Sequence, residues 1–334
     1  MIEHRKREPA KDVFRLELPL PFPGLERVNA YLLAGPDGSV LIDCGLQDPN
    51  LDDGGWGDLI AALDACDASV DGIETLIVTH PHIDHYGMAA RLVEEVDCEL
   101  WMHEAAGEEL EAYREPSRMA QELRDLLRDH GVGPDEVDEL AAFEDWRSFV
   151  SGVVEPARSL KGGETFEAAG RRWSVVHTPG HSASHVCISS PDEGIFVSGD
   201  TLLGSITPHI DFRREGSGNP LGDYLRSLQT IEELAPRLVL PGHGRPFEDG
   251  ADRARAIARH HERRLGAILQ VVRHEPHSAE EITHAVFGNT LLNFQKRLAL
   301  GEALAHIAYL RLNGELERSR HEDGTYVYKK AARR

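Results

Sequence analysis

A polar run that directly follows an apolar one constrains this chain more than any other feature. Residues 73–78 are rich in β-branched side chains and have the length of a buried strand. The next residues read Thr79-His80-Pro81-His82-Ile83-Asp84-His85. In an extended segment His80 and His82 project to the same side, so both imidazoles can reach one ion. Asp84 and His85 follow where the chain turns and can face a neighbouring ion. Because imidazole and carboxylate suit zinc and related divalent metals, the run predicts a metal site rather than a surface loop rich in His and Asp.

Further polar residues stand just past other apolar segments that we expect to be strands. These are Asp43 after residues 39–42, His181 after 173–178, Asp200 after 194–198 and His243 after 238–240. Pro-Gly and Ser-Gly turns at these places let the backbone bend sharply under the side chain. Together with the cluster at 80–85, the pattern predicts a single site at one edge of the sheets.

A helical stretch from about 104 to 150 separates two of these segments. Pro116 and the run Gly131-Val132-Gly133-Pro134 divide it into three expected helices, with Pro134 in a first turn. Its apolar members are Tyr113, Met119, Leu123, Leu126, Leu127, Phe143, Trp146 and Phe149. Two interpretations stand side by side: ordinary amphipathic packing, and a lid or pocket wall over the site.

The C-terminal part reads as helices followed by a β-hairpin. An Arg-rich helix is expected over 252–273, a capping box at Ser278–Glu281 opens a second helix, and a third is expected over about 300–312. Strands at 315–318 and 325–329 are joined through Asp323-Gly324, a hairpin signal. We therefore expect a domain at residues 1–250 and a small winged-helix-like domain at 251–334.

The charge of the chain limits the partners that it can bind. The chain has 334 residues, 41% of them hydrophobic, and a formal net charge of −21. This charge argues against a general affinity for nucleic acid or for an anionic membrane. It is uneven, because residues 91–150 carry 18 acidic and 6 basic residues whereas residues 251–334 carry 15 basic and 10 acidic ones. The overall charge therefore leaves open what the C-terminal part binds.

Export signals and membrane spans have recognisable sequence features. Residues 1–8 are charged and lead into no apolar core of a secretory signal, and no run approaches the roughly 18 apolar residues of a membrane span. The four cysteines, Cys44, Cys66, Cys98 and Cys187, show no C-x-x-C spacing and indicate reduced thiols. These features predict a cytoplasmic protein with no membrane segment.

With these residues in view, the sequence resembles the metallo-β-lactamase superfamily of hydrolases over roughly residues 12–250. The resemblance is carried by H-x-H-x-D-H at 80–85, His181 in Pro-Gly-His-Ser, Asp200 in Ser-Gly-Asp, His243 in Pro-Gly-His-Gly and Asp43 in Leu-Ile-Asp-Cys-Gly. It implies an α/β fold, a four-layer αββα sandwich, here with a helical insertion. The C-terminal part is similar to the winged-helix extension of a branch that includes endoribonuclease-like enzymes and many bacterial hydrolases.

The resemblance also implies roles for individual residues. His80, His82 and His181 would hold one divalent cation, and Asp84, His85 and His243 a second, with Asp200 bridging the two. Zinc is the first choice, and iron and manganese are the alternatives. A metal-bound hydroxide would attack the substrate, and Asp84 would serve both as ligand and as proton acceptor for the leaving group. Asp43 would orient a metal-binding histidine.

Two residues are weaker candidates for substrate contact. His209 follows Asp200 by nine residues and could donate to a substrate oxygen, with an ordinary loop histidine as the alternative. Tyr86 either packs beneath the site or points into it.

Three functions follow, in order of preference. The first is a dinuclear hydrolase that acts on the ester, thioester or lactone carbonyl of a small molecule. Asp200 favours it, because some true β-lactamases of the family carry cysteine there, and the 42 residues between Asp200 and His243 leave no room for the large inserted domain of the nucleic-acid-processing branch. The second is a metal-dependent endoribonuclease or phosphodiesterase, supported by Arg255, Arg259 and Arg263. The third is a non-catalytic scaffold that forms homodimers through its C-terminal domain.

Overall fold

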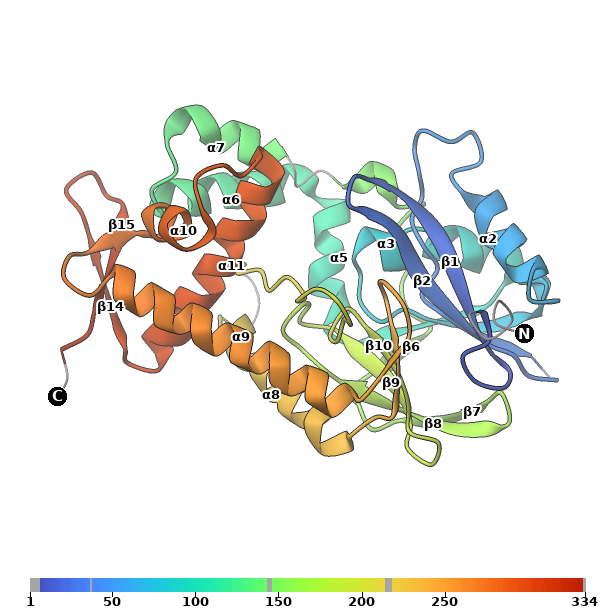
Figure 1. The fold of residues 1–334 in the computed structure, drawn as a ribbon. Helices are drawn as coiled ribbons and strands as arrows, with labels where there is room; N and C mark the ends of the chain where they lie inside the picture. The colour runs from blue at the N-terminus through green and yellow to red at the C-terminus, as the bar shows by residue number, and fades with distance from the viewer. Residues whose placement is uncertain (1–6, 37, 143–145, 214–217, 333–334) are drawn as a thin grey trace.

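Two six-stranded sheets face each other in one half of the molecule, and the C-terminal helices and hairpin make up much of the other half (Figure 1). A computed structural model describes residues 7–36, 38–142, 146–213 and 218–332. The first sheet has the order β1 (Val13–Phe22), β2 (Leu25–Leu33), β3 (Ser39–Ile42), β4 (Ile73–Ile77), β5 (Glu99–His103) and β6 (Arg158–Leu160). The second has the order β12 (Phe247–Glu248), β11 (Leu238–Pro241), β10 (Ile195–Gly199), β9 (Val186–Ser190), β8 (Arg171–His177) and β7 (Thr165–Ala168).

Strand residues alternate between two apolar layers. In β10, Ile195 and Val197 point into the core between the sheets, whereas Phe196 packs on the outer side of the second sheet. Val186 and Ile188 of β9 likewise face inward. Successive strand side chains point to opposite faces, so a strand buried on both sides reads as a continuous apolar run.

Helices cover the outer faces of both sheets. The outer face of the first sheet packs against α2 (Trp56–Asp64), α4 (Ala89–Val96) and α5 (Ala106–Arg114). The second is covered by α8 (Pro220–Leu234) and α9 (Gly250–Val271). The predicted four-layer αββα sandwich is therefore confirmed. Among the described residues, no helix combines the length and apolar character needed to cross a bilayer.

The insertion contains the three expected helices, which pack against two different parts of the molecule. Helices α6 (Pro116–Asp129) and α7 (Pro134–Ala141) follow α5, and both begin with a proline in the first turn. Leu123, Leu127 and Leu140 join the apolar cluster of the C-terminal helices, whereas α5 packs on the first sheet. Ordinary packing thus accounts for most of the stretch. Phe143 lies outside the described residues.

The C-terminal part contains the expected helices and hairpin, but its last helix is longer than predicted. The elements are α10 (Ala279–Phe287), α11 (Asn293–Leu312) and a small sheet of β13 (His277–Ser278), β15 (Tyr326–Lys330) and β14 (Leu316–Arg320). The capping box at Ser278 is present. The predicted start of α11 near residue 300 is wrong, because Lys296 and Arg297 are buried in ion pairs and extend the helix where the sequence reads as polar surface. The winged-helix comparison and the boundary at residue 250 stay predictions.

Candidate metal centre

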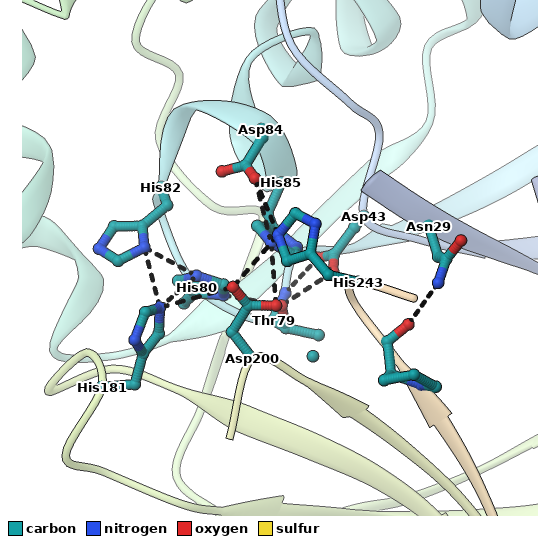
Figure 2. A network of polar contacts seen from close by, with 12 residues as sticks. Asn29, Asp43, Thr79, His80, His82, Asp84, His85, His181, Asp200 and His243 are labelled. Carbon is teal, nitrogen blue, oxygen red and sulfur yellow. Dashed lines mark hydrogen bonds and ion pairs between the residues drawn. The ribbon is translucent and has the colours of Figure 1, made fainter. Parts of the chain in front are cut away.

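All seven predicted donor residues meet at one edge of the two sheets (Figure 2). The candidate groups are His80 with His82 and His181, His80 with His85 and Asp200, and Asp84 with His85 and His243. Within each group the donor atoms lie within 4.8 Å of one another. Each donor follows the end of a strand or lies on the short helix α3 (Ile83–Tyr86) after β4.

Three imidazole nitrogens form a compact triangle on one side of the cluster. Nε2 of His181 lies 3.2 Å from Nε2 of His80 and 3.0 Å from Nδ1 of His82, and the last two atoms are 3.0 Å apart. A tetrahedral ion at a zinc–nitrogen distance of 2.0–2.1 Å needs nitrogens about 3.3–3.4 Å apart. The triangle therefore fits one divalent cation with a small outward adjustment.

The other side of the cluster is rich in carboxylates. Nε2 of His243 lies 3.1 Å from Oδ2 of Asp84 and 3.3 Å from Oδ2 of Asp200. Nε2 of His85 lies 3.5 Å from Oδ1 of Asp200, and these two buried atoms have no hydrogen-bond partner in the described structure. Buried polar atoms are normally paired, so an orphaned nitrogen and oxygen facing each other fit a bound cation.

In four of the donor histidines, the ring nitrogen that faces away from the cluster makes a hydrogen bond, and this bond sets the orientation of the ring. Nδ1 of His181 donates to the His209 carbonyl at 2.7 Å, and Nδ1 of His243 donates to the Arg27 carbonyl at 2.9 Å. A carbonyl only accepts, so in the neutral rings Nε2 carries a lone pair. The fixed tautomer is the form that binds a metal.

Asp43 orients the remaining two. Its carboxylate accepts from Nδ1 of His85 at 2.7 Å, from the Thr79 backbone NH at 2.7 Å and from the Thr79 hydroxyl at 2.9 Å. The Thr79 hydroxyl in turn accepts from Nδ1 of His80 at 3.0 Å. Asp43 has a φ of 60°, in the left-handed region that aspartate tolerates better than most residues. One carboxylate thus holds His85 directly and His80 through a hydroxyl group.

The protonation of the histidines differs between the two sides. Burial lowers the pKa of His80, His82 and His181, which keeps these rings neutral. Burial also opposes the charged form of His243, but the carboxylates of Asp200 and Asp84 outweigh it and raise the pKa to about 10. In the absence of a cation, protons on this side compensate for the buried carboxylates. A divalent cation supplies the same positive charge, so the charge balance also fits metal binding.

The sharp turns beside the donors leave no room for side chains. A Cβ on Gly242 would lie 2.3 Å from Oδ1 of Asp200 and 2.7 Å from Cε1 of His85. Gly242 is therefore glycine because two candidate ligands approach its Cα. The side chains of Asp84 and Asp200 are 13% and 11% exposed, so both carboxylates keep a small contact with solvent.

The two weaker candidates for substrate contact both lie next to donor residues. Tyr86 is fully buried, and its hydroxyl accepts from the Val154 backbone NH at 3.0 Å. Of the two alternatives for Tyr86, the structure therefore shows packing beneath the site. The backbone carbonyl of His209 accepts the hydrogen bond from His181, and Nδ1 of its side chain lies 3.7 Å from Oε2 of Glu302.

Sequence reasoning missed residues that support the donors. His185 is fully buried, stacks on His80 with ring centroids 4.8 Å apart, and its Nε2 accepts from the Asp200 backbone NH at 3.1 Å. Glu109 of α5 accepts from the Ser182 hydroxyl at 2.8 Å and from the Ser184 backbone NH at 3.1 Å, and so anchors the loop that carries His181. Residues 181–185 form a turn before β9, so no periodicity indicated His185. The sequence around Glu109 also gave no signal for its contact with this loop.

Comparison with known proteins agrees with the geometry. The model of the metallo-beta-lactamase superfamily matches residues 23–243, and a model described as a metallo-beta-lactamase-like C-terminal domain matches residues 265–331. The probable metallo-hydrolase YqjP of Bacillus subtilis is 30% identical over 246 residues, which cover 71% of this chain and 73% of the relative.

Two further matches cover most of the chain. A protein named acyl-coenzyme A thioesterase MBLAC2 from Homo sapiens is 26% identical over 255 residues, covering 73% of this chain and 82% of the relative. The crystal structure of a metallo-beta-lactamase family protein from Thermus thermophilus superposes with a TM-score of 0.80 at 31% identity, covering 96% of this chain and 99% of the other. The similarity to the crystal structure thus includes the C-terminal helices and hairpin.

Proposed function

The chain belongs to the metallo-beta-lactamase superfamily and is a hydrolase of that superfamily, and on this premise we propose that it hydrolyses a small-molecule thioester at a site for two divalent cations. The observation that carries the proposal is the convergence of seven donor side chains in two adjoining groups, one of imidazoles and one rich in carboxylates. The thioester is preferred over a simple ester or lactone because a relative is named acyl-coenzyme A thioesterase.

In this proposal the donors divide as the resemblance implies. His80, His82 and His181 hold one cation, Asp84, His85 and His243 hold the other, and Asp200 lies between them. When bound, divalent cations supply Lewis acidity, which lowers the pKa of coordinated water and polarises a carbonyl group. Zinc is the first choice because imidazole and carboxylate suit it, with iron and manganese as alternatives.

The residues of the chain supply orientation and proton transfer. Asp43 keeps the protons of His85 and, through Thr79, of His80 on the outward nitrogens. Asp84, whose side chain is 13% exposed, can accept a proton and pass it to the sulfur of the leaving thiol. Burial raises the pKa of Asp84, but the nearby His85 and His243 outweigh burial and lower the pKa to about 2. The Asp84 carboxylate is therefore ionised at neutral pH.

We expect protein purified without chelators to contain close to two equivalents of metal per chain. The reason is that each of the two donor groups offers at least three ligand atoms, which is enough for a divalent ion that keeps a position open for water or substrate. Elemental analysis before and after zinc addition measures this. A value of one equivalent that does not change on addition of zinc would contradict the two-cation proposal.

The substrate class is tested with the zinc-loaded protein and a panel of compounds. Acyl-coenzyme A thioesters of several chain lengths, lactones, β-lactams and single-stranded RNA are compared by kcat/KM, with thiol release as the direct readout for thioesters. Thioesters are expected to give the largest values. Cleavage confined to RNA or to β-lactams would refute the proposal.

The charge of the C-terminal helices distinguishes this proposal from a nuclease. Arg255 pairs with Glu232 at 2.8 Å and with Asp252, and Lys296 and Arg297 are buried in ion pairs. These groups have protein carboxylates as partners, which leaves less positive charge for phosphates than the sequence suggests. Arg259 and Arg263 are exposed on α9.

Replacing Arg255, Arg259 and Arg263 together by glutamine is therefore expected to leave thioester turnover within about twofold. Each lost phosphate contact on a single strand would flatten the slope of log K against log salt by about 0.7. We expect weak RNA binding in the natural protein and little change in the triple variant, measured by titration at several salt concentrations. Tight, salt-dependent RNA binding that is lost in the variant would favour the nuclease instead.

A further inference from the structure

The loop that follows Asp200 is held along its length by helices outside the metal centre. This loop, residues 201–212, leaves the end of β10 and runs toward α11 (Figure 1). The Tyr224 hydroxyl of α8 donates to the Thr201 carbonyl at 2.9 Å. The Arg253 guanidinium of α9 donates to the Leu203 and Ile206 carbonyls, both at 2.6 Å.

The far end of the loop is bound by a two-pronged ion pair to α11. Nη1 of Arg297 lies 3.2 Å from Oδ1 of Asp211, and Nη2 lies 3.0 Å from Oδ2. The two side chains are 6% and 14% exposed. Such a pair is directional as well as strong, because the planar guanidinium matches the carboxylate in only a narrow range of orientations. The Phe212 backbone NH also donates to the Gly301 carbonyl at 3.2 Å.

Gly301 marks where the loop approaches the helix. A Cβ at this position would lie 1.9 Å from Oδ1 of Asp211 and 2.8 Å from Nη1 of Arg297. Glycine is a poor helix former, and this one stands in the interior of the 20-residue helix α11. The close approach of the Asp211 carboxylate is the physical reason for a glycine here.

The same loop carries the carbonyl that orients His181. That carbonyl belongs to His209, two residues before Asp211, and it accepts from Nδ1 of His181 at 2.7 Å. Glu302, beside Gly301, lies 3.7 Å from Nδ1 of His209 and forms an ion pair with Arg264. The His209 carbonyl thus lies in a segment that contacts α11 through the His209 side chain and through Asp211 and Phe212.

A neighbouring group of His261, Glu302 and His306 has a different character from the metal centre. Nδ1 of His306 donates to the Glu302 backbone carbonyl at 2.7 Å, and its Nε2 lies 3.0 Å from Nδ1 of His261, which suits a hydrogen bond. Arg264 already neutralises the Glu302 carboxylate. The group therefore supports α9, α11 and the loop, and a further cation there would meet an adjacent positive charge.

We propose that α11 helps to orient a ligand of the metal centre, with Arg297 and Gly301 as positioning residues for His181. By holding Asp211 and Phe212 they place the His209 carbonyl, which keeps the His181 proton on Nδ1 and leaves Nε2 for the cation. The C-terminal domain thereby sets the affinity of the group formed by His80, His82 and His181. The inference rests on the proposed function in so far as it takes these three residues as ligands of one cation.

The test compares zinc affinities of the full chain by competition with a chromophoric chelator, without substrate. Arg297→Gln and Gly301→Ala are compared with Lys296→Gln as matched control, because Lys296 is adjacent, is also buried, and pairs with Glu136 and Glu280 rather than with the loop. Outer contacts to metal ligands typically change affinity about 10–100-fold. We expect one of the two zinc affinities to fall by that factor in both variants and the other to stay within about twofold, with both unchanged in the control.

Thermal unfolding of the metal-free proteins shows whether each variant is folded. Gly301→Ala decides the question if Arg297→Gln does not fold, because alanine favours the helix and a loss of zinc affinity then comes from displacement of Asp211. Zinc affinities equal to those of the control would overturn the proposal, and so would an equal loss at both positions. Failure of the wild type to cleave thioesters would refute the substrate proposal and leave this comparison valid.

Discussion

Replacing Asp84 by asparagine is expected to lower kcat for the thioester by about 10²–10⁴-fold, the usual contribution of general acid–base catalysis. Asp84 lies 3.1 Å from Nε2 of His243 through Oδ2, and it is among the more accessible groups of the centre. An amide has nearly the same shape and can still bind a metal weakly, but it cannot accept a proton. Metal content should therefore fall less than turnover does.

The measurement pairs steady-state kinetics with elemental analysis on the same preparation. Asp58→Asn, a like change on the exposed first turn of α2, is the control and should match the natural protein. Turnover close to the natural rate in Asp84→Asn would show that the proton passes through another group. A complete loss of metal would show that Asp84 is required for metal binding.

Replacing His181 by alanine is expected to remove one equivalent of metal per chain. It is also expected to lower kcat/KM by at least about 10³-fold. His181 supplies one corner of the triangle of nitrogens with His80 and His82, and the two remaining imidazoles alone bind a divalent ion poorly. Lewis-acid stabilisation contributes several kcal/mol to such a reaction, and each 1.36 kcal/mol changes the rate about tenfold. The affected cation should be the one assigned to the imidazole group.

Elemental analysis and zinc titration measure this loss directly. His274→Ala removes an imidazole from an exposed position on the C-terminal side and serves as control. If His181→Ala retained two equivalents and natural turnover, the imidazole triangle would not be the catalytic metal site. If both equivalents were lost, the two cations would bind as a unit.

The sheets and the donors were predictable to a large extent because each is encoded locally. The run at 73–78 and the motif after it require only a strand and a turn, and β4 with α3 realises both. Pro116 and Pro134 mark helix starts because a proline at the first helical position gives up an NH that would have no partner in the helix. The start of α11 was missed because burial of Lys296 and Arg297 depends on the carboxylates of Glu136 and Asp211, which are far away in the sequence.

Local sequence was enough to identify the side chains that can serve as metal ligands, since strand ends and tight glycine turns place them at one edge of the sheets. How those ligands are held depends instead on three-dimensional packing. Asp43 reaches His85 across 42 residues, and Asp211 reaches Arg297 across 86. Packing also brings the backbone carbonyl of His209 to Nδ1 of His181, a contact that the sequence did not indicate. These contacts join segments that neither periodicity nor motif connects, because hydrogen bonds depend on distance in space and not on separation along the chain.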